Sequence, residues 1–121
     1  MRPEEFYLRD IIFACKEANL YVRGISKTDF EVSKMVQSAV MFNLMIIGEA
    51  ASKISGGLRA RHAEVDWQSL KGFRNIITHE YFSLNIDIVW DSAQINSIEL
   101  IEQVEAIFKI EYPDFPLTIH K

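Results

Sequence analysis

Apolar residues recur every three or four positions along most of this chain, the spacing of one face of an α-helix. The first such face predicts a helix that ends near Gly24 and comprises Leu8, Ile11, Cys15, Ala18 and Val22. A second helix is predicted from a cap at Ser26 or Thr28 to about Ile54. Its apolar stripe comprises Val36, Val40, Leu44, Ile47, Ala51 and Ile54.

Two further helices are predicted after Gly56-Gly57, which we expect to start a loop. The third is capped by Asp66 and runs from Trp67 to roughly Glu80. The fourth is capped by Asp87 or Asn85, and its inner face comprises Trp90, Ala93, Leu100, Val104 and Ile107, with Ile101 and Phe108 beside them. Pro113 and Pro116 predict an extended tail over residues 112–121. The pattern therefore predicts an all-α, antiparallel four-helix bundle without strands.

The second predicted helix is apolar on more than one face. Met35, Phe42, Met45 and Ile46 lie off its main stripe. A helix that is apolar on several faces must be covered on several faces, so we expect a subunit interface here and a homodimer. Glu49 is an acid in the same helix, and the sequence leaves open whether it pairs with Arg74 or points to solvent.

The length of 121 residues predicts a single domain, residues 1–121. The lone Cys15 at a core position favours a reducing, cytoplasmic setting, and the N-terminus lacks the pattern of a signal peptide. The most apolar stretch, Ala39 to Ala51, is too short to cross a bilayer, so no membrane association is expected.

The net charge of −4 argues against broad electrostatic binding of nucleic acid. The charge is unevenly distributed, because the segment Arg59–His79 has four cations against two acids, which leaves −6 on the rest. This segment is either a local site for a selective RNA contact or a solvated helix surface that happens to be basic.

The most informative motif is Arg74-Asn75-Ile-Ile-Thr-His79-Glu-Tyr81, which reads R-N-x-x-x-H-x-Y. Arginine can hold a phosphate with a planar, permanently charged fork, and histidine can move a proton near neutral pH. Together they can cut a phosphodiester without a metal, whereas the simpler interpretation is a helix end with favourable cations. Cleavage by a ribose 2'-OH needs both a base and an acid, so one histidine per subunit again favours a dimer with a shared cleft.

The remaining candidates are assigned structural roles or left open. We expect Trp67 and Trp90 in the core and the histidines His62 and His120 in solvent. Tyr81 either exposes its hydroxyl or packs at the edge of the core. The histidines and the cysteine show no metal-ligand spacing, so neither a metal nor another cofactor is expected. The paired aspartates of a nucleotidyltransferase site are also missing, so the chain is not expected to be such an enzyme.

The chain resembles the HepT-like toxins of the HEPN superfamily from about Phe6 to Phe108. The blocks that carry the resemblance are Phe30, Ala39-Val40, Asn43-Leu44, Ile47-Gly48-Glu49-Ala50, Asp66-Trp67, Gly72-Phe73-Arg74-Asn75, His79-Glu80-Tyr81 and Ile86-Asp87-Ile88-Val89-Trp90. The stretch between Gly56 and Asp66 does not align clearly.

This resemblance implies a ribonuclease in which Arg74 and His79 are catalytic. From their own positions, we expect Asn75 to orient the substrate or His79, and Glu49 to support the site if it pairs with Arg74. It also implies a toxin that acts on RNA, paired with a small MNT-type nucleotidyltransferase antitoxin that adenylates Tyr81. The rival hypotheses are a non-catalytic subunit that binds a nucleotide or the transferase, and a purely structural dimeric bundle.

Overall fold

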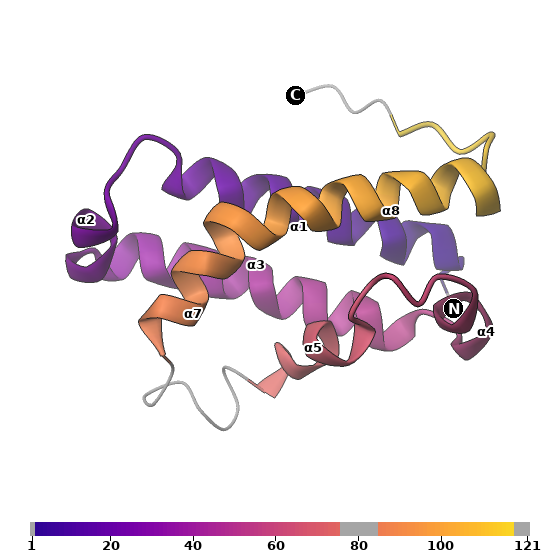
Figure 1. Cartoon of the computed structure of the whole chain (residues 1–121), viewed down its shortest axis with the longest axis horizontal. Coiled ribbons are helices and arrows are strands. Elements are labelled where there is room, and N and C mark those ends of the chain that lie inside the picture. Colours follow the sequence, from indigo (N-terminus) through magenta and orange to yellow (C-terminus); the bar gives the residue numbers. More distant parts are fainter. Residues whose placement is uncertain (1, 76–84, 118–121) are drawn as a thin grey trace.

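The fold is a bundle of α-helices, seen in a computed structural model that describes residues 2–75 and 85–117 (Figure 1). The helices are α1 (Glu4–Val22), α2 (Lys27–Val32), α3 (Lys34–Lys53), α4 (Gly56–Arg61), α5 (Trp67–Gly72), α7 (Ile86–Asp91) and α8 (Ser97–Glu111). A π-helical turn, η2 (Ser92–Asn96), joins α7 to α8 without a break in the chain's helical course.

Helix α1 lies beside both α3 and α8 and runs antiparallel to each of them (Figure 1). Helix α5 packs on α3. The predicted face of the first helix is fully buried, and Cys15, Trp67 and Trp90 lie in the core as expected. The positions predicted for the inner face of the fourth helix are also buried, and Asn85 is its cap, since its Oδ1 accepts from the Asp87 amide at 2.8 Å. The all-α bundle is therefore confirmed.

The segment predicted as the second helix consists of two helices, α2 and α3, because the helix is interrupted at Ser33. Ser33 has extended backbone angles, and its hydroxyl accepts from the Val36 amide, so it caps α3. Gln37 donates to the carbonyls of Phe30 and Glu31 at the end of α2, at 2.8 and 3.0 Å. Serine competes well with the helix for backbone hydrogen bonds, and these contacts satisfy both ends of the break. The predicted start at Ser26 is confirmed by a capping box with Asp29.

The loop expected at Gly56-Gly57 is the first turn of α4, which corrects the sequence prediction. Ser55 caps this turn by accepting from the Leu58 amide, and the Leu58 side chain is completely buried. Arg59 donates to the carbonyl of Ile54 at the end of α3, at 3.0 Å. A cap, a buried anchor and a side-chain bond together outweigh the modest cost of two glycines in a helix.

His62 is buried, which corrects the expectation of a solvated loop histidine. Its Nε2 lies 2.6 Å from Oε2 of Glu111 at the end of α8, and its carbonyl accepts from the Trp67 indole at 3.0 Å. Arg61 adds two contacts of 2.9 Å to the same carboxylate. These bonds lower the pKa of Glu111 to about 2, with Arg61 as the main cause and His62 as the second. The contacts of Arg61 and His62 with Glu111 therefore connect α4 to the end of α8.

The chain leaves the helix after Glu111, as the two prolines predicted. Residues 112–117 are packed, because the Phe115 ring contacts the rings of Phe6 and Phe108 at 5.4 and 5.2 Å between centroids. The expected extended tail is therefore wrong for residues 112–115, which form a turn closed by the Phe115 amide donating to the Tyr112 carbonyl at 3.0 Å. His120 lies outside the described residues.

Helix α3 is long and apolar enough to cross a membrane by length and composition alone, with a mean hydropathy of 1.3. In this fold it contacts α1, α2, α5 and α7. The buried central helix of a helical bundle can have the same length and composition, so these two properties of α3 are weak evidence for a membrane span.

The Glu111 cluster predicts a specific pH dependence of stability. A carboxylate whose pKa falls from 4.5 to about 2 on folding stabilises the folded state above its unfolded pKa. That contribution is lost as the pH falls from about 4.5 through about 2. Glu111→Gln should therefore lower the midpoint of thermal unfolding at neutral pH, and the difference from the wild type should shrink across this interval.

The matched control is Glu102→Gln, which removes an exposed acid from the same helix. It should leave the unfolding midpoint nearly unchanged at every pH. A Glu111→Gln deficit that stays constant between pH 7 and pH 2 would contradict the assigned role.

Candidate functional site

Arg74 lies in a turn at the end of α5. Asp66 starts this short helix by accepting from the amide and the hydroxyl of Ser69, at 3.2 and 2.7 Å. The helix ends at Gly72, earlier than the predicted end near Glu80, and Phe73 and Arg74 form the turn that follows. Asn75 is exposed at the end of the first described segment. His79 and Tyr81 lie outside the described residues.

The position of Arg74 depends on Gly48 of α3. A Cβ atom at Gly48 would lie 2.7 Å from the Arg74 amide nitrogen and 2.9 Å from the Leu70 carbonyl oxygen. Real Cβ atoms do not approach backbone atoms so closely, so only glycine permits this packing. An isolated glycine in an apolar helix often signals close packing, and this was the available sequence sign of the contact.

Glu49, the next residue of α3, faces the Arg74 side chain. Its Oε1 lies 3.0 Å from Nε of Arg74, and both side chains are 51 % exposed. Lys53, one turn further along, lies 3.8 Å from the other carboxylate oxygen. The two alternatives for Glu49 are thus both partly right, because it pairs with Arg74 and also reaches solvent. An exposed pair of this kind adds little stability but fixes the direction of the guanidinium.

Among the described residues, the guanidinium of Arg74 pairs with Glu49 alone. Arginine has five N–H donors, and the contact with Glu49 uses the one on Nε. The terminal nitrogens can still hold two oxygens of a phosphate in a bidentate arrangement. The contact with Glu49 therefore orients the Nε edge of the guanidinium, and the two terminal nitrogens can face a ligand.

The basic excess of the segment Arg59–His79 is partly compensated within the fold. Arg61 pairs with Glu111, and Arg74 pairs with Glu49. Both acids come from outside the segment, which is why counting charges along it could not reveal the pairing. The described part of this segment is therefore less basic in the fold than its own charges indicate.

A hollow beside Glu49 lies between α1 and α3. Its volume is about 370 Å³, and its lining includes Tyr7, Met45, Ile46 and Glu49. Met45 and Ile46 belong to the off-stripe surface of α3, of which Phe42 is 55 % exposed and Met35 is 81 % exposed. The apolar surface expected to contact a second subunit thus borders the residue that orients Arg74.

Metal ligands are not gathered in the part of the chain that the structure describes. No group of three histidine, cysteine, aspartate or glutamate side chains in residues 2–75 and 85–117 could hold an ion.

Comparisons with known proteins identify the family of this chain. A family model described as ribonuclease HepT-like matches residues 11–107. A protein named as a candidate RNase in Caldanaerobacter subterraneus subsp. tengcongensis is 33 % identical, over 92 % of this chain and 99 % of its own length. A protein named probable ribonuclease HepT in Thermococcus cleftensis is 31 % identical, over 77 % of this chain and 84 % of its own.

A third relative, also named as a candidate RNase, comes from Methanocaldococcus jannaschii. It is 28 % identical over 88 % of this chain and 97 % of its own length. No solved structure is significantly similar. The match to the family model spans most of the bundle, including both Glu49 and Arg74. The chain therefore belongs to the ribonuclease HepT-like family.

Proposed function

We propose that this protein is a metal-independent endoribonuclease and the toxin of a toxin–antitoxin pair in the cytoplasm. The observation that carries the proposal is the oriented Arg74, held by Gly48 and Glu49 at the start of the R-N-x-x-x-H-x-Y motif. Membership of a ribonuclease family and relatives named as RNases support the activity. The substrate is RNA, because the proposed reaction requires a ribose 2'-OH.

In the proposed reaction the 2'-OH attacks the adjacent phosphorus while His79 removes its proton. A new P–O2' bond forms, the P–O5' bond breaks, and the departing 5'-oxygen receives a proton from the protonated motif histidine of a second copy of the chain. The products are a 2',3'-cyclic phosphate and a 5'-hydroxyl end. Arg74 stabilises the negative charge that grows on the phosphoryl oxygens, and Asn75 orients the substrate or His79. Glu49 is a positioning residue, because it acts on the reaction through Arg74.

The dimer proposal joins two requirements. The acid and the base must both be supplied, and each chain has one histidine in the motif. The apolar outer surface of α3 borders Glu49, so two copies that meet there bring two motifs toward one cleft. We expect light scattering at micromolar concentration to give about twice the chain mass of 14.0 kDa. A monomer at that concentration would contradict both the interface and the shared cleft.

The second candidate function is a non-catalytic subunit in which Arg74 and His79 only bind a phosphate. The exposed guanidinium is compatible with this role as well. A cleavage assay separates the two functions, because a binding subunit retains RNA without cutting it.

Arg74→Ala and His79→Ala should each reduce RNA cleavage by about 100-fold or more, because each removes a group that acts in the transition state. Helix content should be unchanged, since Arg74 is half exposed and its pair with Glu49 contributes little stability. The measurement is the rate of cleavage and the detection of a cyclic phosphate end, with and without EDTA.

Two control variants sharpen this test. Lys71→Ala removes a neighbouring cation of α5 and should leave most of the activity, whereas Arg74→Lys keeps the charge but loses the bidentate fork and should remain impaired. Activity that survives Arg74→Ala and His79→Ala, or that EDTA abolishes, would exclude the proposed mechanism.

We further propose that an MNT-type nucleotidyltransferase neutralises the toxin by adenylating Tyr81. Tyr81 follows His79 by two residues, so an added nucleotide would stand close to the motif. Its phosphate would compete for the oxygen-binding edge of Arg74 and repel incoming RNA. The added nucleotide would thus inhibit the ribonuclease directly, by occupying the site where RNA binds.

Tyr81→Phe should remain an active ribonuclease, because the phenol takes no part in the reaction, but it should resist the partner transferase. Intact-mass measurement after incubation with transferase and ATP should show one added adenylate on the wild type and none on the variant. An equal mass increase on both proteins would exclude Tyr81 as the modified residue, and inhibition without any increase would indicate simple binding.

A further inference from the structure

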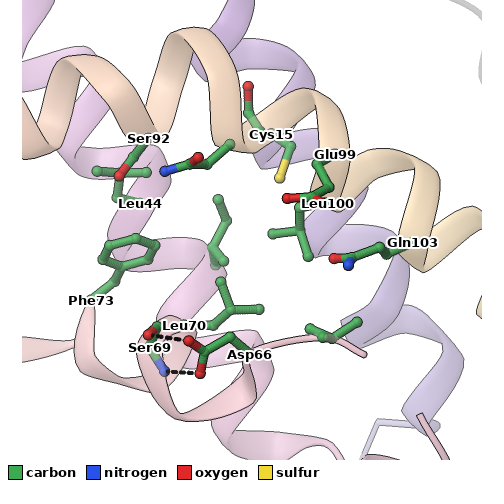
Figure 2. Close-up of a pocket in the computed structure, with 14 residues that line it drawn as sticks. Cys15, Leu44, Asp66, Ser69, Leu70, Phe73, Ser92, Glu99, Leu100 and Gln103 are labelled. Carbon is green, nitrogen blue, oxygen red and sulfur yellow. Dashed lines mark hydrogen bonds between the residues drawn. The ribbon is translucent and has the colours of Figure 1, made fainter. Parts of the chain in front are cut away.

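A second cavity lies between α3, α5 and the continuous helix formed by η2 and α8 (Figure 2). Its volume is about 220 Å³, and neither Glu49 nor Arg74 lines it. Its apolar lining includes Leu44, Ile47, Leu70, Phe73 and Leu100. Cys15 also contributes, and burial raises the pKa of its thiol to about 12, so that this group stays neutral. The interior therefore accommodates an uncharged, apolar body.

The charged groups of this cavity are all acidic. Asp66 and Glu99 line it, and among the described residues no lysine, arginine or histidine does. Hydrogen bonds from Ser69 hold the pKa of Asp66 below its ordinary value, so this group is a carboxylate at neutral pH. Glu99 makes no hydrogen bond or ion pair with another described residue. The lining thus favours a cation and disfavours phosphates, including those of RNA.

The hydroxyl of Ser92 belongs to the cavity lining. Ser92 of η2 is 6 % exposed and its backbone amide and carbonyl are bonded within the helix, whereas no described residue bonds to its side chain. The hydroxyl is open to the cavity, so it can bond to a molecule inside it. The π-helical turn that presents Ser92 is fixed, because the Ala93 carbonyl accepts from Asn19 and from Ser97. Such turns occur frequently at functional sites.

Ser92 and Glu99 lie at opposite ends of the cavity (Figure 2). Seven residues separate them, which corresponds to roughly 10 Å along a helix. A single small molecule can therefore contact both, provided that it is positive at one end and has a hydrogen-bonding group at the other. Asn96 and Ser97 line the cavity between the two ends on this helix, and Leu44, Ile47 and Leu70 on the facing helices then contact its hydrocarbon body.

We propose that this cavity binds a small amphipathic amine with a hydroxyl group at the end remote from the nitrogen. Its ammonium group pairs with Glu99, in the negative field to which Asp66 contributes. Its apolar body packs on Leu44 and Leu70, and its hydroxyl bonds to Ser92. Because the cavity separates α5 from α8, the bound amine bridges these two helices and steadies the turn that carries Phe73 and Arg74.

Three probes of similar shape test the proposal. Tyramine has both the ammonium and the hydroxyl, phenethylamine lacks the hydroxyl, and tyrosol replaces the ammonium by a neutral hydroxyl. Calorimetry on the full chain without RNA should show saturable binding of tyramine, with each of the other two binding about tenfold or more weakly. Binding is measured without catalysis, so this result is independent of the proposed ribonuclease function.

Variants connect the binding to the assigned residues. Glu99→Gln should make tyramine bind no better than tyrosol, and Ser92→Ala should reduce tyramine to the level of phenethylamine. Ser69→Phe places a ring at an exposed position of the lining and should block all three probes. Glu102→Gln, an exposed acid that does not line the cavity, is the matched control and should bind tyramine normally.

Several results would overturn the proposal. They are no saturable binding of tyramine, equal binding of tyrosol, or binding that survives both Glu99→Gln and Ser69→Phe. Circular dichroism of each variant shows whether it is folded. If Ser92→Ala proves unfolded, the comparison of tyramine with phenethylamine on the wild type still tests the hydroxyl contact.

Discussion

The candidate site depends on one close contact, the approach of the Arg74 backbone to the surface of α3 at Gly48. Any side chain at this position would meet backbone atoms of α5 and of the turn after it, and backbone atoms cannot move aside as the end of a flexible side chain can. The contact brings the turn against α3 one residue before Glu49. Because Glu49 is the residue after Gly48, its carboxylate then lies within 3.0 Å of Nε of Arg74. A glycine and an acid in succession thus determine both the position and the direction of the guanidinium.

The features that the sequence predicted well are those that depend on local periodicity. Leu8, Ile11 and Cys15 are buried because one face of α1 meets the rest of the bundle, and the 3.6-residue period alone identifies that face. Asp66 and Asn85 were identifiable as caps for the same reason, since a cap bonds to amides two or three residues away. Arg74 became a candidate through its spacing from His79 and Tyr81, and its catalytic role stays a prediction.

The features that the sequence did not predict depend on partners far along the chain or on small differences between local alternatives. His62 looks like a loop histidine until Glu111, 49 residues later, is placed beside it. The break at Ser33 and the helix at Gly56 each depend on a few hydrogen bonds whose net contribution is about 1 kcal/mol apiece. Periodicity cannot resolve differences of that size. The acidic partners of Arg61 and Arg74 could not be predicted from the sequence for the first of these reasons, because Glu111 and Glu49 lie on other helices.

Helix α3 connects these features, because its successive residues face different neighbours. Leu44 and Ile47 line the cavity, Gly48 meets the end of α5, and Met45, Ile46 and Glu49 border the outer hollow. This arrangement explains why α3 is apolar on more than one face. Helix α5 also connects the two regions. Its residues line the cavity, and the turn that follows it carries Arg74. Phe73 lines the cavity, and Arg74, the next residue, meets α3 at Gly48. The same turn therefore contacts the cavity with one residue and α3 with the next.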